Sequence, residues 1–547
     1  MKGYAASKRL AWVAGGVLTA AAGVHAQTLP PVPSASPPMP EASAPAGGAV
    51  AGAAPAPVAP TSAPATYIVP SVAVLATQSS NANFGTGASA RSDTLLQLVP
   101  RVFFQSSHAR WNVQGDLSAN ANYYVSGVQP SLVTPSGDAL LHSEWVRNLL
   151  FLDAAFSAVQ QTVSPFQGQG GALQGSSYTS TQWRLSPYIE RRLRPGLQLL
   201  VRSDDTWTHT TNTPAIGGIA GGRYLDQHAS LEQAPSPLGY GLDLRQTYAT
   251  YDNEPYAWLR DSTLRGSAGI ALTPRLVVGL IAGRERVQAY AAQQDVTLYG
   301  GRLQWHPTLT GSVDARVEHR YFGTAWQLDA TGGGARSRLS LHWSRNVDSA
   351  LAPLGSNATA TSNLTTLLNG LLVTQVPDPL QRARLVQQLL GESGLPPGLQ
   401  TSGGYYTTSS VVRNDLVLTA MILRVRDSFA VSLYRNRDED LFLPGQDLLR
   451  LVQTTSNNNL QTGVAFTYGH RLTPLDNLSV TLQRENDTGF GFNQGRSARQ
   501  RAVIVQLDRR LSARTIALVG LRRRLLTSTV VLGGTETAVF AGFVHRF

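Results

Sequence analysis

Long stretches in which apolar and polar side chains alternate constrain this fold more than any other feature of the sequence. From Trp111 to Tyr123 the odd-numbered positions are apolar, aromatic or small, and the even-numbered positions carry Asn, Gln, Asp and Ser. Successive side chains of a β-strand point to opposite faces, so this period of two indicates a strand with one apolar and one polar face. At about 3.3 Å per residue the segment is long enough to cross a lipid bilayer at a tilt.

The same alternation recurs from residue 67 to the end of the chain. It is clear at 183–190, 312–321, 338–344, 429–434 and 478–483. Soluble β-sandwiches also alternate, but their strands are usually about five or six residues long. Long alternating strands separated by turn residues are typical of a transmembrane β-barrel.

The composition fits that class and excludes others. Charged residues make up 14% of the 547 residues, against about 25% in ordinary soluble proteins. The net charge of +11 comes from scattered Arg and contains no long basic run, so we expect no nucleic-acid partner. The chain has no Cys, which excludes disulfides, thiolate metal sites and Cys nucleophiles.

The first 65 residues differ from the rest. Residues 1–26 have a basic start, an apolar stretch and a small residue at Ala26, which predicts a cleaved signal peptide; the alternative is an uncleaved anchor. Residues 27–65 contain 11 Pro among Ala, Ser, Gly and Thr, so we expect a disordered Pro/Ala-rich periplasmic tether or a plain spacer. The predicted barrel covers residues 66–547.

The predicted connections alternate between short turns and longer loops, as in outer-membrane barrels. Counting them predicts an all-β, antiparallel up-and-down transmembrane β-barrel of about 22 strands. The range is 18–22, because segments 139–146 and 223–233 are weak strands. We expect 126–138 and 436–457 to be long loops, the second of which would hold the acidic trio Asp438, Glu439 and Asp440.

The longest predicted loop, 350–405, is too long for a simple connection. Segments 364–371 and 379–390 have the pattern of short helices, the second beginning with Pro379 after Asp378. Two interpretations remain open. The loop folds into the barrel and narrows it, or it forms a cap outside.

Charged residues should point into the lumen, because an arginine on the lipid face costs about 2–4 kcal/mol near the bilayer midplane. The lumen-lining candidates are Arg184, Arg202, Arg245, Arg265, Arg302, Asp314, Arg316, Glu318, Arg320, Asp329 and Arg338. They form either a lining that selects solutes or a network of opposite charges that stiffens the wall.

The last strand ends on an aromatic residue. Val539, Ala541, Phe543, His545 and Phe547 share one face, and the chain stops at Phe547. This pattern resembles the signal that the outer-membrane barrel assembly machinery recognises, although His545 replaces the more usual aromatic residue. We therefore expect that machinery to be a partner.

Five stretches, taken in their order and spacing, resemble one family. They are FLDAA at 151–155, SPF at 164–166, LSPY at 185–188, EHRYFG at 318–323 and HWSR at 342–345. Together they are similar to the outer-membrane proteins associated with the PEP-CTERM/exosortase system. The resemblance implies a barrel in the outer membrane of a bacterial cell, linked to exopolysaccharide genes, and it carries over no site residues.

The sequence thus favours a porin-like channel or export-associated barrel that contacts outer-membrane lipid, lipopolysaccharide and exopolysaccharide export components. A non-conducting scaffold barrel is the main alternative, and an outer-membrane enzyme is less favoured. We expect no catalytic residues, metal site or cofactor. A TonB-dependent transporter is disfavoured, because residues 27–65 cannot supply a folded plug.

Overall fold

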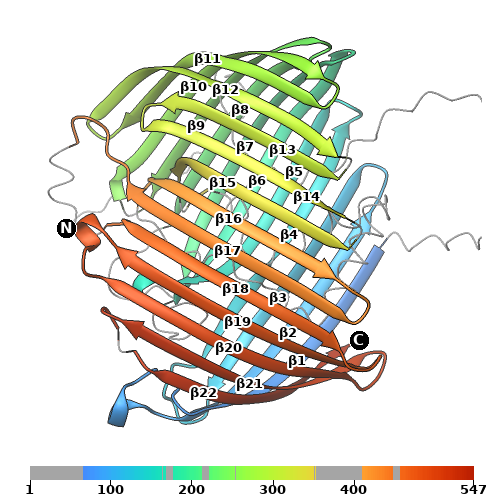
Figure 1. Ribbon diagram of the computed structural model, residues 1–547, viewed down its shortest axis with the longest axis vertical. Coiled ribbons are helices and arrows are strands. Elements are labelled where there is room, and N and C mark those ends of the chain that lie inside the picture. Colours follow the sequence, from blue (N-terminus) through green and yellow to red (C-terminus); the bar gives the residue numbers. More distant parts are fainter. Residues whose placement is uncertain are drawn as a thin grey trace, which may run out of the picture.

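The computed structural model describes residues 66–162, 164–167, 177–211, 221–252, 254–308, 310–334, 336–349, 351–352, 409–446, 456–531 and 533–547. In this part of the chain, 22 β-strands form a single antiparallel sheet. Figure 1 shows the strands side by side and tilted around a barrel. No helix among the described residues is long and apolar enough to cross a membrane.

The strands follow one another around the wall in chain order. The first eleven are β1 Thr66–Ser79, β2 Asp93–Ser107, β3 Trp111–Tyr124, β4 Leu132–Val146, β5 Leu150–Thr162, β6 Ser177–Arg194, β7 Leu197–Thr211, β8 Gly222–Gln233, β9 Leu238–Tyr251, β10 Glu254–Thr273 and β11 Leu276–Ala289. The others are β12 Ala292–Thr308, β13 Gly311–Arg320, β14 Gly323–Gly334, β15 Ser337–Asp348, β16 Val411–Leu423, β17 Asp427–Asp440, β18 Asn459–Arg471, β19 Asp476–Gly489, β20 Ser497–Arg510, β21 Thr515–Ser528 and β22 Thr535–Arg546. Among the described connections, three contain a short 3-10 turn: η1 Gly87–Ser89, η2 Pro165–Gln167 and η4 Gly491–Asn493.

The barrel closes where β1 pairs with β22. Their register runs from Ser71 opposite Arg546 to Ser79 opposite Ala538, and the Phe547 amide donates to the Pro70 carbonyl at 3.0 Å. Closure leaves no sheet edge with unpaired backbone groups. A closed barrel is the one sheet arrangement whose backbone is fully satisfied inside lipid.

The predicted fold class and the count of 22 strands are confirmed. The predicted short turns fall at one end of the barrel, which we call the short-turn end. The other end, with η1, η2 and η4, is the long-loop end. The predicted helices at 364–371 and 379–390 lie outside the described residues.

Two predicted boundaries were wrong. β4 begins at Leu132, so the connection before it is shorter than predicted; Gly137, with a φ of 138°, lets the strand continue through an irregular position. The acidic trio is not in a loop, because β17 continues to Asp440 and pairs there with β16. Asp438 is buried in an ion pair, which explains why an acidic residue is accommodated in a strand.

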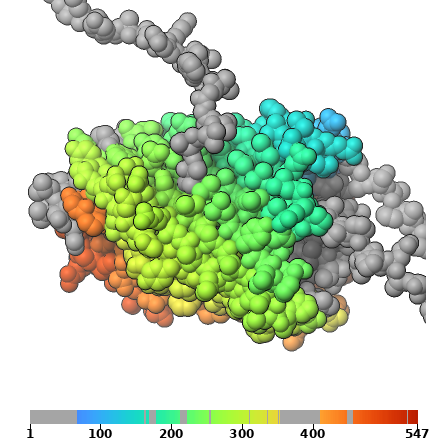
Figure 2. All heavy atoms as spheres, turned by 90° about the horizontal axis from the view of Figure 1, so that it is seen from above, coloured from blue at the N-terminus to red at the C-terminus, as the bar shows by residue number. Residues whose placement is uncertain are grey.

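Large apolar side chains are exposed on the outside of the wall. Exposed Leu264, Leu280, Leu433, Leu482 and Val503 come from five different strands. Figure 2 shows one side of the barrel as a continuous surface, coloured from cyan through green to yellow. The neighbours of these residues along each strand point inward, and many of them are polar and buried.

Candidate functional site: the charged lumenal wall

The lumenal face over β8–β13 is built around a contact between Arg265 and Glu318. Arg265 Nε lies 3.2 Å from Glu318 Oε1, and both side chains are buried. Two strands separate β10 from β13, so their backbones are about 14 Å apart at the usual strand spacing. Side chains converge across such a distance only on the concave side of a sheet. This contact therefore places both residues inside the barrel.

Glycines on the two intervening strands leave room for this contact. Gly283 is paired with Arg265, and Gly300 is paired with Glu318. A Cβ added at Gly300 would lie 3.0 Å from Glu318 Cγ and closer still to the Val317 carbonyl oxygen. The small residues thus let the long side chains lie across β11 and β12.

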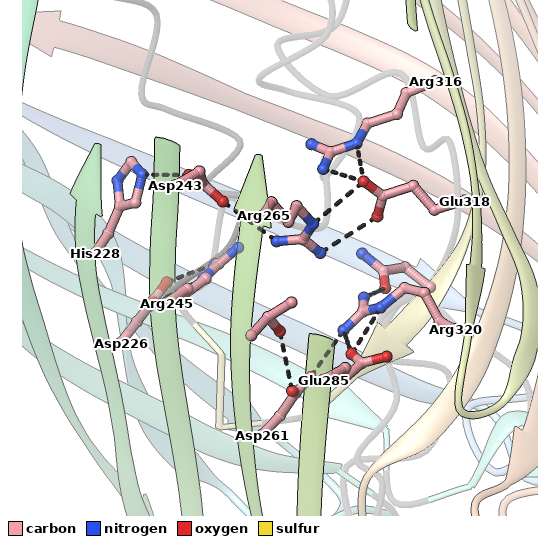
Figure 3. Close-up of polar contacts among 12 residues, drawn as sticks. Asp226, His228, Asp243, Arg245, Asp261, Arg265, Glu285, Arg316, Glu318 and Arg320 are labelled. Carbon is pink, nitrogen blue, oxygen red and sulfur yellow. Dashed lines mark hydrogen bonds and ion pairs between the residues drawn. The ribbon is translucent and has the colours of Figure 1, made fainter. Parts of the chain in front are cut away.

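Further ion pairs extend the network in both directions (Figure 3). Arg320 donates from Nε to Glu285 and from Nη2 to Asp261, each at 2.8 Å. Arg245 donates from Nε to Asp226 at 2.7 Å. The remaining members are Arg316, which donates to Glu318 at 2.6 Å, and Asp243, which contacts Arg265 at 3.4 Å and His228 at 3.0 Å. In this region most charges face an opposite charge.

A second network lies over β4–β7. Arg202 donates to Asp153 and to Asp204, each at 2.9 Å. Asp153 is also 2.8 Å from His142, and the Arg202 guanidinium lies over the Tyr188 ring at 4.9 Å. Carboxylates again alternate with cationic or aromatic partners around the wall.

The lumenal face over β14–β19 is different, because carboxylates predominate there. Within the described residues, two basic side chains pair with members of this set. Arg413 pairs with Asp348 and Asp438, and His342 lies 2.6 Å from Asp329 and 4.0 Å from Asp415. The carboxylates are Asp329, Asp348, Asp415, Asp438, Glu485 and Asp487. We call this set the acidic wall.

Glu485 and Asp487, two residues apart on β19, make no ion pair within the described residues. Instead, the Tyr434 hydroxyl donates to Glu485 across β18. Gly463, which is paired with Glu485, makes this reach possible, since a Cβ there would lie 2.1 Å from Tyr434 Cζ. No group of three or more His, Cys, Asp or Glu suited to a metal ion occurs in the described part of the chain.

Three loops fold inward over the lumen at the long-loop end. Phe166 of η2 accepts a hydrogen bond from Ser528 of β21 at 2.6 Å. Leu351, after β15, packs on Tyr178 and Tyr251 of β6 and β9. The third loop, after β17, packs against Val287 of β11 through Leu443. Each loop reaches a strand separated from its own by five others, so the described parts of these loops narrow the opening.

The predicted lumen-lining residues divide among these networks and the acidic wall. The structure brings Arg245, Arg265, Arg316, Glu318 and Arg320 into the β8–β13 network. Arg202 belongs to the second network, and Asp329 to the acidic wall. Three others make separate contacts: Arg302 with Glu232, Asp314 with Gln304, and Arg338 with Thr310 and Thr331. Arg184 lies on the same inward face of β6 as the buried residues Gln182 and Ser186.

Sequence reasoning missed several members of these networks. They are His142, Asp153, Asp226, His228, Asp261, Glu285, Asp348, Arg413, Asp415, Asp438, Glu485 and Asp487. The alternation along each strand could have placed them, because each shares the inward face with polar neighbours two residues away. Asp226 and His228 lie on β8, which the sequence pattern marked only weakly.

No protein-family model matches this chain, and no curated protein is similar to it in sequence. Among solved structures, it is similar to the siderophore receptor PirA from Acinetobacter baumannii, with a TM-score of 0.44, 7% identity and coverage of 88% of this chain and 80% of PirA. It is also similar to the outer membrane protein OpdK from Pseudomonas aeruginosa, with a TM-score of 0.33, 9% identity and coverage of 88% and 99%. These are likenesses between barrels.

Proposed function

We propose that the protein is an outer-membrane, porin-like channel that passes small polar solutes and prefers cations. The observation that carries this proposal is the acidic wall, a run of lumenal carboxylates over β14–β19 that includes Asp329, Asp415 and the adjacent inward pair Glu485 and Asp487. Carboxylates along one side of a pore raise the local concentration of cations and favour their passage.

The size of the barrel supports conduction. Barrels of 16–18 strands already enclose an aqueous channel, and this barrel has 22. The loops that fold inward through Phe166, Leu351 and Leu443 would then restrict the passage at the end that faces outside the cell. The proposal assigns the barrel no catalytic step and no cofactor.

Planar-bilayer recordings of the refolded barrel under a KCl gradient test the proposal. The wild type should conduct and show a reversal potential of the sign that indicates cation preference. The double variant Asp329→Asn/Asp415→Asn should shift that potential toward zero, because both carboxylates flank His342 on the acidic wall and their side chains are 40% and 25% exposed.

Asp295→Asn is the matched control, because Asp295 is an exposed carboxylate paired with Arg286 on β11. It should leave the reversal potential unchanged. A barrel that inserts but does not conduct would overturn the proposal. A reversal potential that is the same in the wild type and the double variant would refute the role of the acidic wall.

A non-conducting scaffold is the second candidate. The inward-folded loops and the paired charges of β8–β13 favour it, because both fill the lumen and stiffen the wall. In that case the tether at 27–65 and the long loops would hold other export components. A barrel that inserts correctly into the bilayer but does not conduct would support the scaffold.

We also propose the cellular setting that the family resemblance implies, a link to PEP-CTERM and exopolysaccharide surface systems. Two of the stretches that carry the resemblance supply Asp153 and Tyr188 to the network over β4–β7, and another supplies Glu318 and Arg320. Insertion would depend on the barrel assembly machinery reading the terminal strand. In that strand, Val539 and Phe543 are exposed on the outer face, and the ring centroids of His545 and Phe547 are 4.8 Å apart.

A further inference from the structure

Four arginines lie on the outer, lipid-facing surface of three neighbouring strands. Arg484 is on β19, Arg499 and Arg501 are on β20, and Arg523 is on β21, and all four side chains are exposed. They share their face with the exposed apolar residues Leu482, Val503 and Leu521. These strands lie next to one another in Figure 1.

The register brings like charges together. Arg484 is paired directly with Arg501, and Arg523 is paired with Val503, the next outward residue after Arg501. Like charges in directly opposed positions of a sheet are destabilising. Within the described residues no ion pair involves any of the four, and Arg499 donates only to the Asn486 amide oxygen, at 3.0 Å.

Two outward arginines elsewhere on the barrel have carboxylate partners, whereas Arg260 on β10 donates to the Gln246 amide oxygen at 3.0 Å. Arg223 lies 2.5 Å from Asp205 across β7 and β8. Arg286 lies 2.7 Å from Asp295 across β11 and β12. Both pairs are near the long-loop end, as the four arginines are. On β19–β21, by contrast, four outward arginines lie together, and the described residues give none of them a carboxylate partner.

The cluster sits where the apolar surface ends. Toward the short-turn end, the outward face continues with Leu482, Val503 and Leu521. Toward the long-loop end, it continues with polar Asn486, Thr488 and Thr527, while Leu525, paired with Arg501, lies at the height of the cluster itself. This is the height of lipid headgroups, and the long-loop end of an outer-membrane barrel faces the outer leaflet.

We propose that Arg484, Arg499, Arg501 and Arg523 bind the phosphate groups of a phosphorylated glycolipid of the outer leaflet, the lipid A part of lipopolysaccharide. A phosphate between Arg484 and Arg501 would remove their mutual repulsion. The planar guanidinium forms paired hydrogen bonds with phosphate oxygens. This inference shares the outer-membrane location with the proposed channel but does not depend on conduction.

Native mass spectrometry of the purified full-length barrel in detergent tests the site. The probes are lipopolysaccharide without O-polysaccharide, the same lipid after removal of its phosphates, and phosphatidylglycerol. The variant Arg484→Gln/Arg501→Gln should bind intact lipopolysaccharide at least about tenfold more weakly than the wild type, because each charge-assisted hydrogen bond contributes about 1.5–3 kcal/mol. Heat-modifiable migration on gels verifies that each variant is folded.

Arg223→Gln/Arg286→Gln is the matched control, because it also removes two outward arginines at the long-loop end. It should bind as the wild type does. Equal binding by both double variants would overturn the site. Undiminished binding of the dephosphorylated lipid would exclude phosphate as the ligand, and equally tight binding of phosphatidylglycerol would exclude specificity for lipid A.

Discussion

The two sides of the lumen carry the same kind of residue in different arrangements. Over β8–β13, the strand β13 alternates in sign along its inward face, with Arg316, Glu318 and Arg320 in succession. Over β14–β19, the strand β19 repeats one sign, with Glu485 followed by Asp487. The first arrangement lets each charge neutralise a neighbour, whereas the second places two carboxyl groups next to one another with no ion pair among the described residues.

The comparison shows that charged side chains facing the lumen have different roles on the two sides of this barrel. A buried charge that pairs with another stiffens the wall, and losing one member leaves the other unpaired in a poorly solvated place. Neutralising a carboxylate that makes no ion pair breaks no such pair, so it should lower the stability of the fold less. Mutations on the two sides should therefore differ in kind, and they can be ranked by size.

The largest expected effect is from Arg265→Met. It leaves Glu318 and Asp243 without one of their cationic partners, so we expect a loss of about 3–5 kcal/mol in the free energy of unfolding. Urea denaturation of the barrel in detergent micelles measures this. Glu485→Gln, on the acidic wall, is the comparison and should not destabilise. If the two variants lose the same stability, the distinction between the two sides fails.

An intermediate effect is expected from Gly463→Ala. The added Cβ would collide with the Tyr434 ring and displace its hydroxyl from Glu485, which should cost about 1–3 kcal/mol as overpacking does. The same urea titration measures the loss. In a Tyr434→Ala background the substitution should be nearly neutral. An undiminished loss there would show that the glycine matters for a reason other than the tyrosine.

The smallest effect should come from Arg302→Gln. Arg302 pairs with Glu232 at 3.0 Å, but the two side chains are 28% and 55% exposed. Water screens such a pair, so we expect a change below about 1 kcal/mol in the same assay. A loss as large as that of Arg265→Met would mean that exposure does not separate structural from peripheral charges on this wall.

Much of the fold was predictable because local rules specify it. The period of two assigned each residue to a face, and the alternation of short and long connections gave 22 strands. Prediction failed where a strand continues past a local interruption, as β4 does through Gly137 and β17 does through Asp438. In both cases, pairing with neighbouring strands maintains a conformation that the local sequence only weakly favours.

The candidate site was less predictable. The sequence gives the inward phase of Arg265 and of Glu318, but these residues are 53 positions apart and meet over two intervening strands. Which of many inward carboxylates faces which arginine depends on the register of every strand between them. The same holds for Leu351 against Tyr178 and Tyr251, since nothing in a short apolar segment specifies targets on β6 and β9, from which at least five strands separate it.

The sequence by itself determined which side chains face lipid and which face the lumen, because the two faces of a strand alternate residue by residue. Only the tertiary structure decided the partners, because closure and register set which positions lie opposite one another. Closure and register therefore decide which inward charges form the paired network of β8–β13 and which form the acidic wall. They also place Arg484 against Arg501 on the outer surface, where their unbalanced charge points to an anion of the membrane.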